Sequence, residues 1–170
     1  APRAAMHEKR NKRIVAWGVI YDFFEVVSSR RGKFLFFLLK FCMSMNAKFL
    51  LNTIIRKKMH SDSYTGWGVS HGMTVFGAKD PWSYFRELAN YSLKRDSARI
   101  TQDFLLMGSS SDHFIPQIFF ASQVAALTNL RSLTARLFTD AEHAGDHVQF
   151  GNLPLAVGCI TNWIKERCES

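Results

Sequence analysis

Several features that would assign a protein class at once are scarce or missing. There are only three cysteines (Cys42, Cys159 and Cys168), an odd number without C-x-x-C spacing. This pattern indicates neither a disulfide framework nor a zinc site, and it favours a reducing compartment, so we expect a cytoplasmic location. No signal peptide, low-complexity tract or repeat at a solenoid period is visible. The sequence thus argues against the disulfide-rich, fibrous and repeat classes.

Long uncharged apolar runs are also missing. The nearest candidate, Phe34–Ile55, contains Lys40 and Lys48, together with two asparagines. A charge at mid-bilayer costs about 3 kcal/mol on insertion scales, so this segment is a poor membrane span. We predict instead two amphipathic helices, broken near Ser44–Asn46, and no integral membrane segment. A basic membrane-surface protein that uses this segment stays open as a weaker alternative.

Acidic residues are outnumbered, and the net charge is +8. Basic side chains that neutralise phosphates would give affinity for nucleic acid. The basic residues are scattered, however, in the short runs Lys9–Arg13, Arg30–Lys33 and Arg56–Lys58. No nucleic-acid-binding motif accompanies them. We therefore expect a solvated surface and no nucleic-acid partner.

What the chain has in quantity is apolar bulk, since 47% of its 170 residues are apolar and 15 are Phe. A domain of this size buries roughly 70% of its unfolded surface. Ile14–Tyr21 is an apolar run typical of a strand buried on both faces of a parallel sheet. Phe104–Met107 predicts a second strand, and the alternating Ser132–Phe138 a third, nearer a sheet edge.

Helices are predicted between these strands. Residues 27–95 are helical in pattern, interrupted by a glycine-bearing loop at Ser61–Gly72 and by Asp80-Pro81, where Asp80 can cap a helix. Pro116 opens a helix to about Leu130. The last helix has an apolar stripe, which we expect to be buried, at Leu153, Ala156, Val157, Ile160, Trp163 and Ile164.

Alternating strands and helices predict an α/β fold with a parallel sheet and right-handed crossovers. Only three strands are recognisable, and three would leave a hydrophobic edge unpaired. The sheet therefore looks incomplete. The first residue is Ala rather than Met, which indicates a chain cut from something longer.

Chemically useful side chains follow two neighbouring strands. Asp112 lies in the turn after Phe104–Met107, and His147 lies in the long loop after Ser132–Phe138. Functional residues of open α/β sheets gather beyond the carboxyl ends of the strands. A carboxylate there can orient an imidazole whose far nitrogen takes a proton from a nucleophile. The two residues together indicate an acid–base pair more specifically than either residue does alone.

Six stretches of the sequence carry a family resemblance. They are APRAA (Ala1–Ala5), YDFFE (Tyr21–Glu25), HGMTVFG (His71–Gly77), GSSSDHFIP (Gly108–Pro116), RLFTDAEHAGDHVQFGN (Arg136–Asn152) and NWI (Asn162–Ile164). In order and spacing the chain resembles the capped α/β-hydrolases related to dihydropseudooxynicotine hydrolase and to fungal hydrolases of pigment and toxin pathways. The family more often has acidic or mixed residues at Ser109–Ser111, a departure that leaves Asp112 intact.

The resemblance implies the roles of these residues. Asp112 would be the triad acid and His147 the triad base. Residues 1–26 and 96–170 would form the hydrolase core, and residues 27–95 a helical cap. A small-molecule substrate would be cleaved at an ester, amide or carbon–carbon bond, as in secondary metabolism, with no cofactor or metal. Homo-oligomers are compatible with this reading.

The resemblance also implies where the nucleophile is. APRAA falls on the helix after the nucleophile elbow, the G-x-S-x-G turn that presents the serine. The elbow, the oxyanion-hole loop and the earlier strands would then precede Ala1. We therefore expect a C-terminal part of a hydrolase. The rival interpretation is a truncated, hydrolase-like protein without catalytic activity.

Three other patterns offer alternatives. Gly68-Val69-Ser70-His71-Gly72 also spells G-x-S-x-G, but polar, turn-like residues rather than a strand precede Ser70. His143 and His147 have a spacing that zinc ligands can have, yet no third ligand is evident. His143 could also replace His147 as the base if the loop were shifted. A further group of residues could line a substrate pocket under the cap, but for most of them we expect packing in the core of the cap: Trp67, Met73, Phe76, Trp82, Tyr84 and Phe85.

Overall fold

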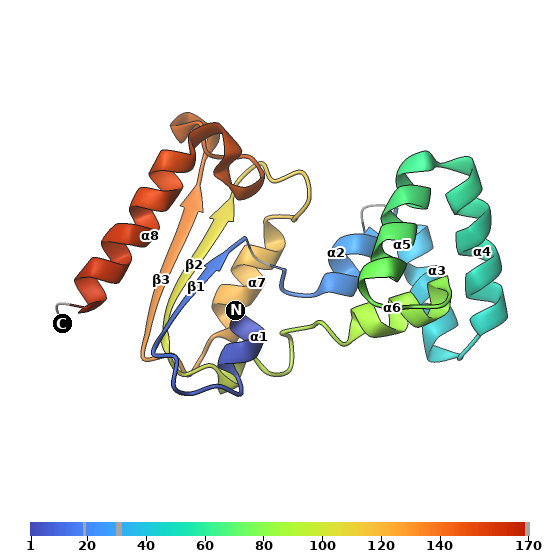
Figure 1. Ribbon diagram of the computed structural model, residues 1–170, viewed down its shortest axis with the longest axis horizontal. Helices are drawn as coiled ribbons and strands as arrows, with labels where there is room; N and C mark the ends of the chain where they lie inside the picture. Colours follow the sequence, from blue (N-terminus) through green and yellow to red (C-terminus); the bar gives the residue numbers. More distant parts are fainter. Residues whose placement is uncertain (19, 30–31, 169–170) are drawn as a thin grey trace. The chain divides into compact units, whose positions relative to one another are not determined.

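The computed structural model describes residues 1–18, 20–29 and 32–168 (Figure 1). The chain divides into two compact units. The sheet unit combines Ala1–Tyr21 with Leu93–Ser170, and the helical unit is Asp22–Ser92. The sequence pattern placed the helical insertion at residues 27–95.

The sheet unit is built on three parallel strands, as predicted. They are β1 (Arg13–Trp17), β2 (Asp103–Ser109) and β3 (Ser132–Phe138), in the order β1-β2-β3 (Figure 1). Trp17 pairs with Met107, and Ser109 pairs with Phe138. The carboxyl ends of all three strands therefore lie at one edge of the sheet, where loops from neighbouring strands can meet.

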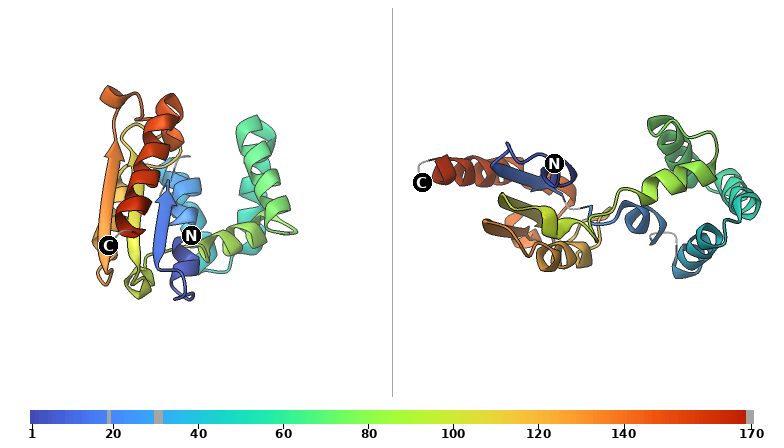
Figure 2. Two further views of the ribbon diagram at one scale, coloured as in Figure 1. Left: turned by 60° about the vertical axis from the view of Figure 1, so that its left-hand side comes forward. Right: turned by 90° about the horizontal axis from the view of Figure 1, so that it is seen from below.

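Helices cover both faces of this sheet, as the ribbon views show (Figure 2). Phe104 and Leu106 of β2 belong to a core that includes residues of α1 (Pro2–Ala5) and α7 (Ile118–Ala126). Leu105 and Met107 face the other way and pack with residues of α8 (Leu153–Cys168). Successive side chains of a strand point to opposite faces, so the unbroken apolar run of β2 feeds two cores.

The strand predictions were partly wrong in extent. β3 has the predicted bounds and lies at a sheet edge. β1 ends at Trp17 rather than Tyr21, because Gly18 takes a left-handed φ of 80° that breaks the extended backbone. Val19 lies outside the described residues. β1 is also an edge strand of the described sheet, and the strand buried on both faces is β2.

Two helix predictions in this unit also need correction. The helix predicted from Pro116 to Leu130 is the shorter α7. The predicted stripe of the last helix is only partly buried: Ala156 and Trp163 are in the core, whereas Val157 is 49% exposed and Ile164 41% exposed. The helix rests on the sheet through Ala156, Cys159, Ile160 and Trp163. The stripe is wider than the contact, so Leu153, Val157 and Ile164 are left outside it.

The helical unit consists of five helices within the described residues. They are α2 (Phe23–Ser29), α3 (Lys33–Ser44), α4 (Lys48–Ser61), α5 (Ser63–Val75) and α6 (Pro81–Ala89). The predicted break near Ser44–Asn46 is confirmed. The predicted cap at Asp80 is also confirmed, since its Oδ1 accepts the Ser83 backbone N–H at 2.8 Å and Pro81 begins the helix.

The loop predicted at Ser61–Gly72 is wrong, because α5 occupies most of it. Asp62 caps this helix by accepting the Tyr64 N–H at 3.2 Å. A Cβ on Gly72 would lie 2.5 Å from the Tyr84 ring, and one on Gly66 would lie 2.8 Å from the Met59 carbonyl oxygen. These glycines permit close helix packing rather than a turn, at the cost of lower helix propensity.

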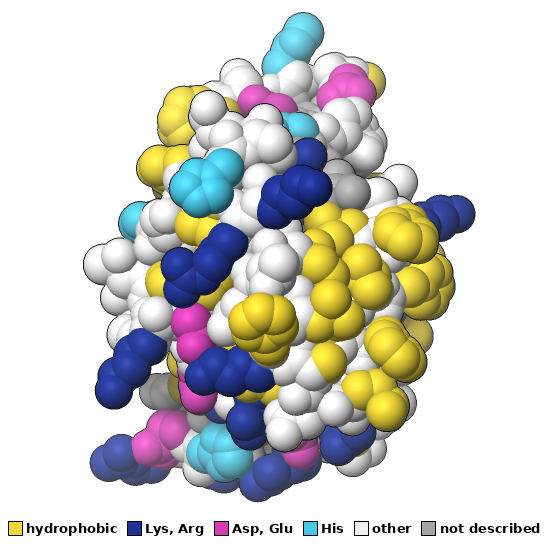
Figure 3. All heavy atoms as spheres, turned by 90° about the vertical axis from the view of Figure 1, so that its right-hand side faces the viewer, with side chains coloured by type: hydrophobic (Ala, Val, Ile, Leu, Met, Phe, Trp, Pro, Cys, Tyr) yellow, Lys and Arg dark blue, Asp and Glu magenta, His cyan; other side chains and the backbone are white. Residues whose placement is uncertain are grey.

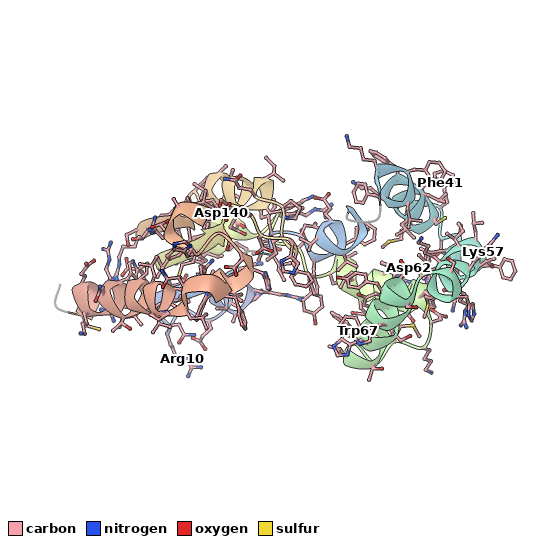
Figure 4. The ribbon with its side chains drawn as sticks, turned by 90° about the horizontal axis from the view of Figure 1, so that it is seen from above. Arg10, Phe41, Lys57, Asp62, Trp67 and Asp140 are labelled. Atoms are coloured by element: carbon pink, nitrogen blue, oxygen red, sulfur yellow. The ribbon has the colours of Figure 1, made fainter. Side chains whose placement is uncertain are left out.

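Three of the six residues considered for a pocket under the cap lie in the core of the helical unit, as expected for most of this set. Trp82, Tyr84 and Phe85 are at most 5% exposed and pack inside the helical unit. Met73 and Phe76 pack at the margin of the same core. Trp67, at 66% exposed, stacks on His71 with ring centroids 5.4 Å apart and lies on the outside of α5 (Figure 4). Packing within one unit therefore explains most of this set.

Some apolar side chains of the helical unit reach the surface, among them Phe34, Phe37 and Phe41 of α3 and Phe49 of α4. Figure 3 shows side chains of this kind gathered on one face. Among the helices described, none combines the length and the apolar character needed to cross a membrane. Cys42, Cys159 and Cys168 are free cysteines, of which Cys42 is buried and Cys168 is exposed.

A buried carboxylate anchors the start of β2. Asp103 accepts hydrogen bonds from the Arg131 guanidinium and, at 2.7 Å, from the Ser132 hydroxyl, and its side chain is 3% exposed. The bond from Arg131, foremost, lowers the pKa of Asp103 to about 2. The carboxylate thereby ties β2 to the start of β3.

We expect this ion pair to make folding acid-sensitive. Asp103 has a lower pKa in the folded chain, about 2, than its ordinary 3.8, so its contribution is present above pH 4 and is lost as the pH falls towards 2. That contribution is at most about 2 kcal/mol, from the size of the shift. Urea unfolding followed by circular dichroism between pH 7 and pH 2 measures it. In Asp103→Asn the free energy of unfolding should depend less on pH below pH 4. An unchanged pH dependence in that variant would show that the Asp103–Arg131 ion pair does not contribute as stated.

Candidate active site

Two loops meet at the carboxyl edge of the sheet. One follows β2, and the other follows β3 and includes the short helical turns η2 (Asp140–Glu142) and η3 (His147–Asn152). The Ser110 N–H donates to the Phe138 carbonyl at 2.9 Å, and the Ser111 N–H donates to the Gly145 carbonyl at 2.8 Å. The Ser111 hydroxyl also donates to Asp140 at 2.5 Å; Asp140 is labelled in Figure 4. The loops are therefore joined by main-chain bonds.

Asp112 has a fixed carboxylate at this junction. Its Oδ1 accepts the backbone N–H groups of Phe114 at 2.7 Å and Ile115 at 2.9 Å. The side chain is only 6% exposed. An Asp that binds the N–H two residues on forms an Asx turn, which the sequence Asp112-His113-Phe114 adopts here. One oxygen is thus used by the turn, and Oδ2 is available for another partner.

That partner is His147. Its Nδ1 lies 2.9 Å from Asp112 Oδ2, across 35 residues of sequence. Since an ionised carboxylate only accepts hydrogen bonds, the neutral imidazole carries its proton on Nδ1, and Nε2 keeps its lone pair. The structure therefore brings together the two residues that the sequence singled out.

The imidazole is held between aromatic rings but keeps access to solvent. Its side chain is 32% exposed. The Phe114 ring meets it edge to face at a centroid distance of 4.8 Å, and His113 lies 5.9 Å away. Within the described residues, no side chain makes a hydrogen bond to His147 Nε2. The arrangement can accept a proton at Nε2 and stabilise the resulting imidazolium with Asp112.

The loop that carries His147 is braced from its other side. Glu142 and Thr139 form a capping box, and the Arg136 guanidinium donates to Glu142, which lowers the pKa of that carboxyl. A Cβ on Gly151 would lie 2.4 Å from the His143 carbonyl oxygen, so the chain approaches itself more closely than other residues allow. His147 therefore lies on a firmly packed loop.

One contact at this site was missed from the sequence. Gln149 is completely buried, accepts a hydrogen bond from the Trp17 indole at 2.5 Å and donates one to the Ser109 hydroxyl at 2.6 Å. Trp17 and Ser109 are the last residues of β1 and β2. A glutamine between apolar residues gives no sign of such partners, because they come from distant parts of the chain.

The alternative site residues are placed differently. His143 closes η2 in a left-handed conformation with φ of 54° and is exposed, and the residue hydrogen-bonded to Asp112 is His147. Ser70 lies inside α5 of the helical unit, so it does not occupy a strand-to-helix turn. No cluster of three or more His, Cys, Asp or Glu suited to a metal ion occurs in the described part of the chain.

The sequence matches no model of a protein family and no curated protein. The class that the fold supports by itself is an α/β protein with an open parallel sheet and flanking helices.

Proposed function

We propose that this chain is the acid- and base-bearing part of a serine-type α/β-hydrolase. The support is the contact between Asp112 Oδ2 and His147 Nδ1 at 2.9 Å, made by loops that follow neighbouring parallel strands. In this class the triad acid and base occupy such loops, in the chain order acid then histidine. The sequence resemblance to capped α/β-hydrolases points the same way.

The proposed reaction cleaves an ester, an amide or a carbon–carbon bond next to a carbonyl in a small molecule. A serine oxygen attacks the carbonyl carbon while His147 Nε2 takes the serine proton. Collapse of the tetrahedral adduct breaks the scissile bond, and His147 returns the proton to the leaving group. A water molecule, deprotonated by His147, then hydrolyses the acyl-enzyme and regenerates the serine. Asp112 keeps the imidazole oriented and stabilises its positive charge.

The nucleophile in this proposal belongs to polypeptide that precedes Ala1. Nothing in the described residues bonds to His147 Nε2, and Ser70 lies within a helix. The absence of a serine bonded to His147 Nε2 among the described residues also favours the second candidate, a hydrolase-like protein that has lost catalysis. The two candidates differ in one respect, namely whether a serine is delivered to His147 Nε2.

Fluorophosphonate labelling separates these candidates. The polypeptide encoded from its start codon through Ser170 should be labelled at the serine of a G-x-S-x-G turn before Ala1, because His147 raises the nucleophilicity of that serine. His147→Ala should abolish labelling while the chain stays folded by circular dichroism. Peptide mapping by mass spectrometry identifies the modified residue.

Two controls show which results would contradict the hydrolase proposal. The 170-residue chain alone should remain unlabelled, and modification at Ser70 would contradict the assignment of the nucleophile. If the start codon adjoins Ala1, the hydrolase proposal is wrong and the inactive relative is favoured. If labelling of the longer polypeptide survives His147→Ala, His147 is not the base that activates the serine and the proposed triad is wrong.

A further inference from the structure

The residues after His147 adopt an unfavourable backbone. Val148 has φ and ψ of 50° and 29°, and Gln149 has 53° and 40°. Left-handed conformations are disfavoured for residues with a Cβ, and a β-branched residue such as Val is a genuine outlier there. Two consecutive residues in this conformation need surroundings that hold them. Neither is glycine, so the backbone alone does not explain the turn.

The Gln149 side chain supplies the restraint. Its amide uses both ends, accepting from Trp17 Nε1 at 2.5 Å and donating to Ser109 Oγ at 2.6 Å. The side chain has no exposed surface. A buried amide without partners would be unfavourable, so the turn is stable only while Gln149 lies between the two strand ends. The side chain of Val148 also packs near the position that a Gly18 Cβ would occupy.

The bond between Gln149 and Ser109 links the chain segments that carry His147 and Asp112. Gln149 follows His147 by two residues, and Ser109 precedes Asp112 by three. A bond between Gln149 and Ser109 therefore fixes the base loop to the acid loop, in addition to the bond between Asp112 and His147. Removing it would let the turn relax, which would withdraw the imidazole from the carboxylate.

We propose that Gln149 is a positioning residue for this pair, holding His147 Nδ1 on Asp112 through its bonds to Trp17 and Ser109. Its importance for catalysis rests on the proposed function. The positioning itself does not, because it is a property of the folded chain.

A second buried glutamine provides a matched control. Gln123 of α7 is also fully buried and donates to the Ser97 hydroxyl at 2.9 Å, but Ser97 belongs to the turn Ser97–Arg99 and not to either loop. Replacing either glutamine by methionine removes a buried amide of similar length. A purely structural role predicts the same outcome for both substitutions. A positioning role predicts a change at His147 for Gln149→Met only.

The experiment is long-range ¹H–¹⁵N NMR on the ¹⁵N-labelled 170-residue chain, which reports the tautomer of each imidazole. His147 of the unsubstituted chain should show the Nδ1–H tautomer, with a slowly exchanging, low-field Nδ1 proton. Gln149→Met should lose that proton signal and give a mixture of tautomers. Gln123→Met should retain both features. Retention of both features in folded Gln149→Met would overturn the proposal.

Further variants keep the test decisive if Gln149→Met does not fold. Trp17→Phe and Ser109→Ala each remove one partner of the Gln149 amide while its side chain stays, and the double variant should reproduce the loss of the Nδ1 signal. An unchanged signal in the folded double variant also overturns the proposal.

The outcome is separable from that of the proposed function. NMR needs neither a nucleophile nor a substrate, so failed labelling leaves the positioning result standing. If the longer polypeptide is active, Gln149→Met should lower kcat on the order of 100-fold, the size of effect that a small misplacement of a catalytic group produces, with KM unchanged. A change in KM alone would contradict positioning.

Discussion

Asp112→Asn should lower the rate of fluorophosphonate inactivation of the longer, serine-containing polypeptide by about 10⁴-fold, the effect of a wrong histidine tautomer in Ser–His–Asp enzymes. The Asn carbonyl oxygen would keep the two backbone bonds from Phe114 and Ile115, which leaves its NH₂ group facing His147 Nδ1. An amide NH₂ only donates, so His147 would carry its proton on Nε2. It could then no longer accept the serine proton.

A second carboxylate in the neighbouring loop gives the control for charge. The Asp140 carboxylate accepts a hydrogen bond from the Ser111 hydroxyl, whereas the carboxylate hydrogen-bonded to His147 is that of Asp112. Asp140→Asn removes the same charge and should leave the inactivation rate within about threefold of the unsubstituted enzyme, since exposed charges interact weakly through solvent. A loss smaller than tenfold in Asp112→Asn, or equal losses in both variants, would show that Asp112 is not the triad acid.

Phe85→Ala should cause the largest loss of stability that we expect in the helical unit. Phe85 has no exposed surface, lies edge to face with Phe24 at a centroid distance of 6.1 Å and contacts Tyr84 at 5.0 Å. Truncating a fully buried Phe to Ala costs about 3–5 kcal/mol, because apolar contacts are lost and a cavity remains. Urea unfolding followed by circular dichroism measures the change.

The control for this substitution is the same chemical change on the surface of the same unit. Phe34 is 82% exposed, so Phe34→Ala should change the free energy of unfolding by less than about 0.5 kcal/mol. If the two variants lose similar stability, Phe85 does not lie in the core of the helical unit as described.

Features that depend on neighbouring residues were predicted from the sequence. The Asp80 cap needs only Ser83 and Pro81, and the break between α3 and α4 follows from local composition. The bounds of β3 follow from its alternation. Asp112 and His147 were found because each follows a strand, and parallel strands deliver their ends to one edge. Their roles as triad acid and base stay predictions.

Features that depend on distant residues were decided only by the tertiary structure. The glycines of α5 predict a loop unless Tyr84 and Met59 are known to lie against them. The stripe of α8 is wider than the part of the helix that the sheet covers, so the sequence alone overstated its burial. The buried partner of Gln149 is Trp17, which lies 132 residues away in the sequence. The physical reason is common to all three: propensity and periodicity are read from adjacent residues, whereas close approach and buried polar pairing are set by segments that only folding brings together.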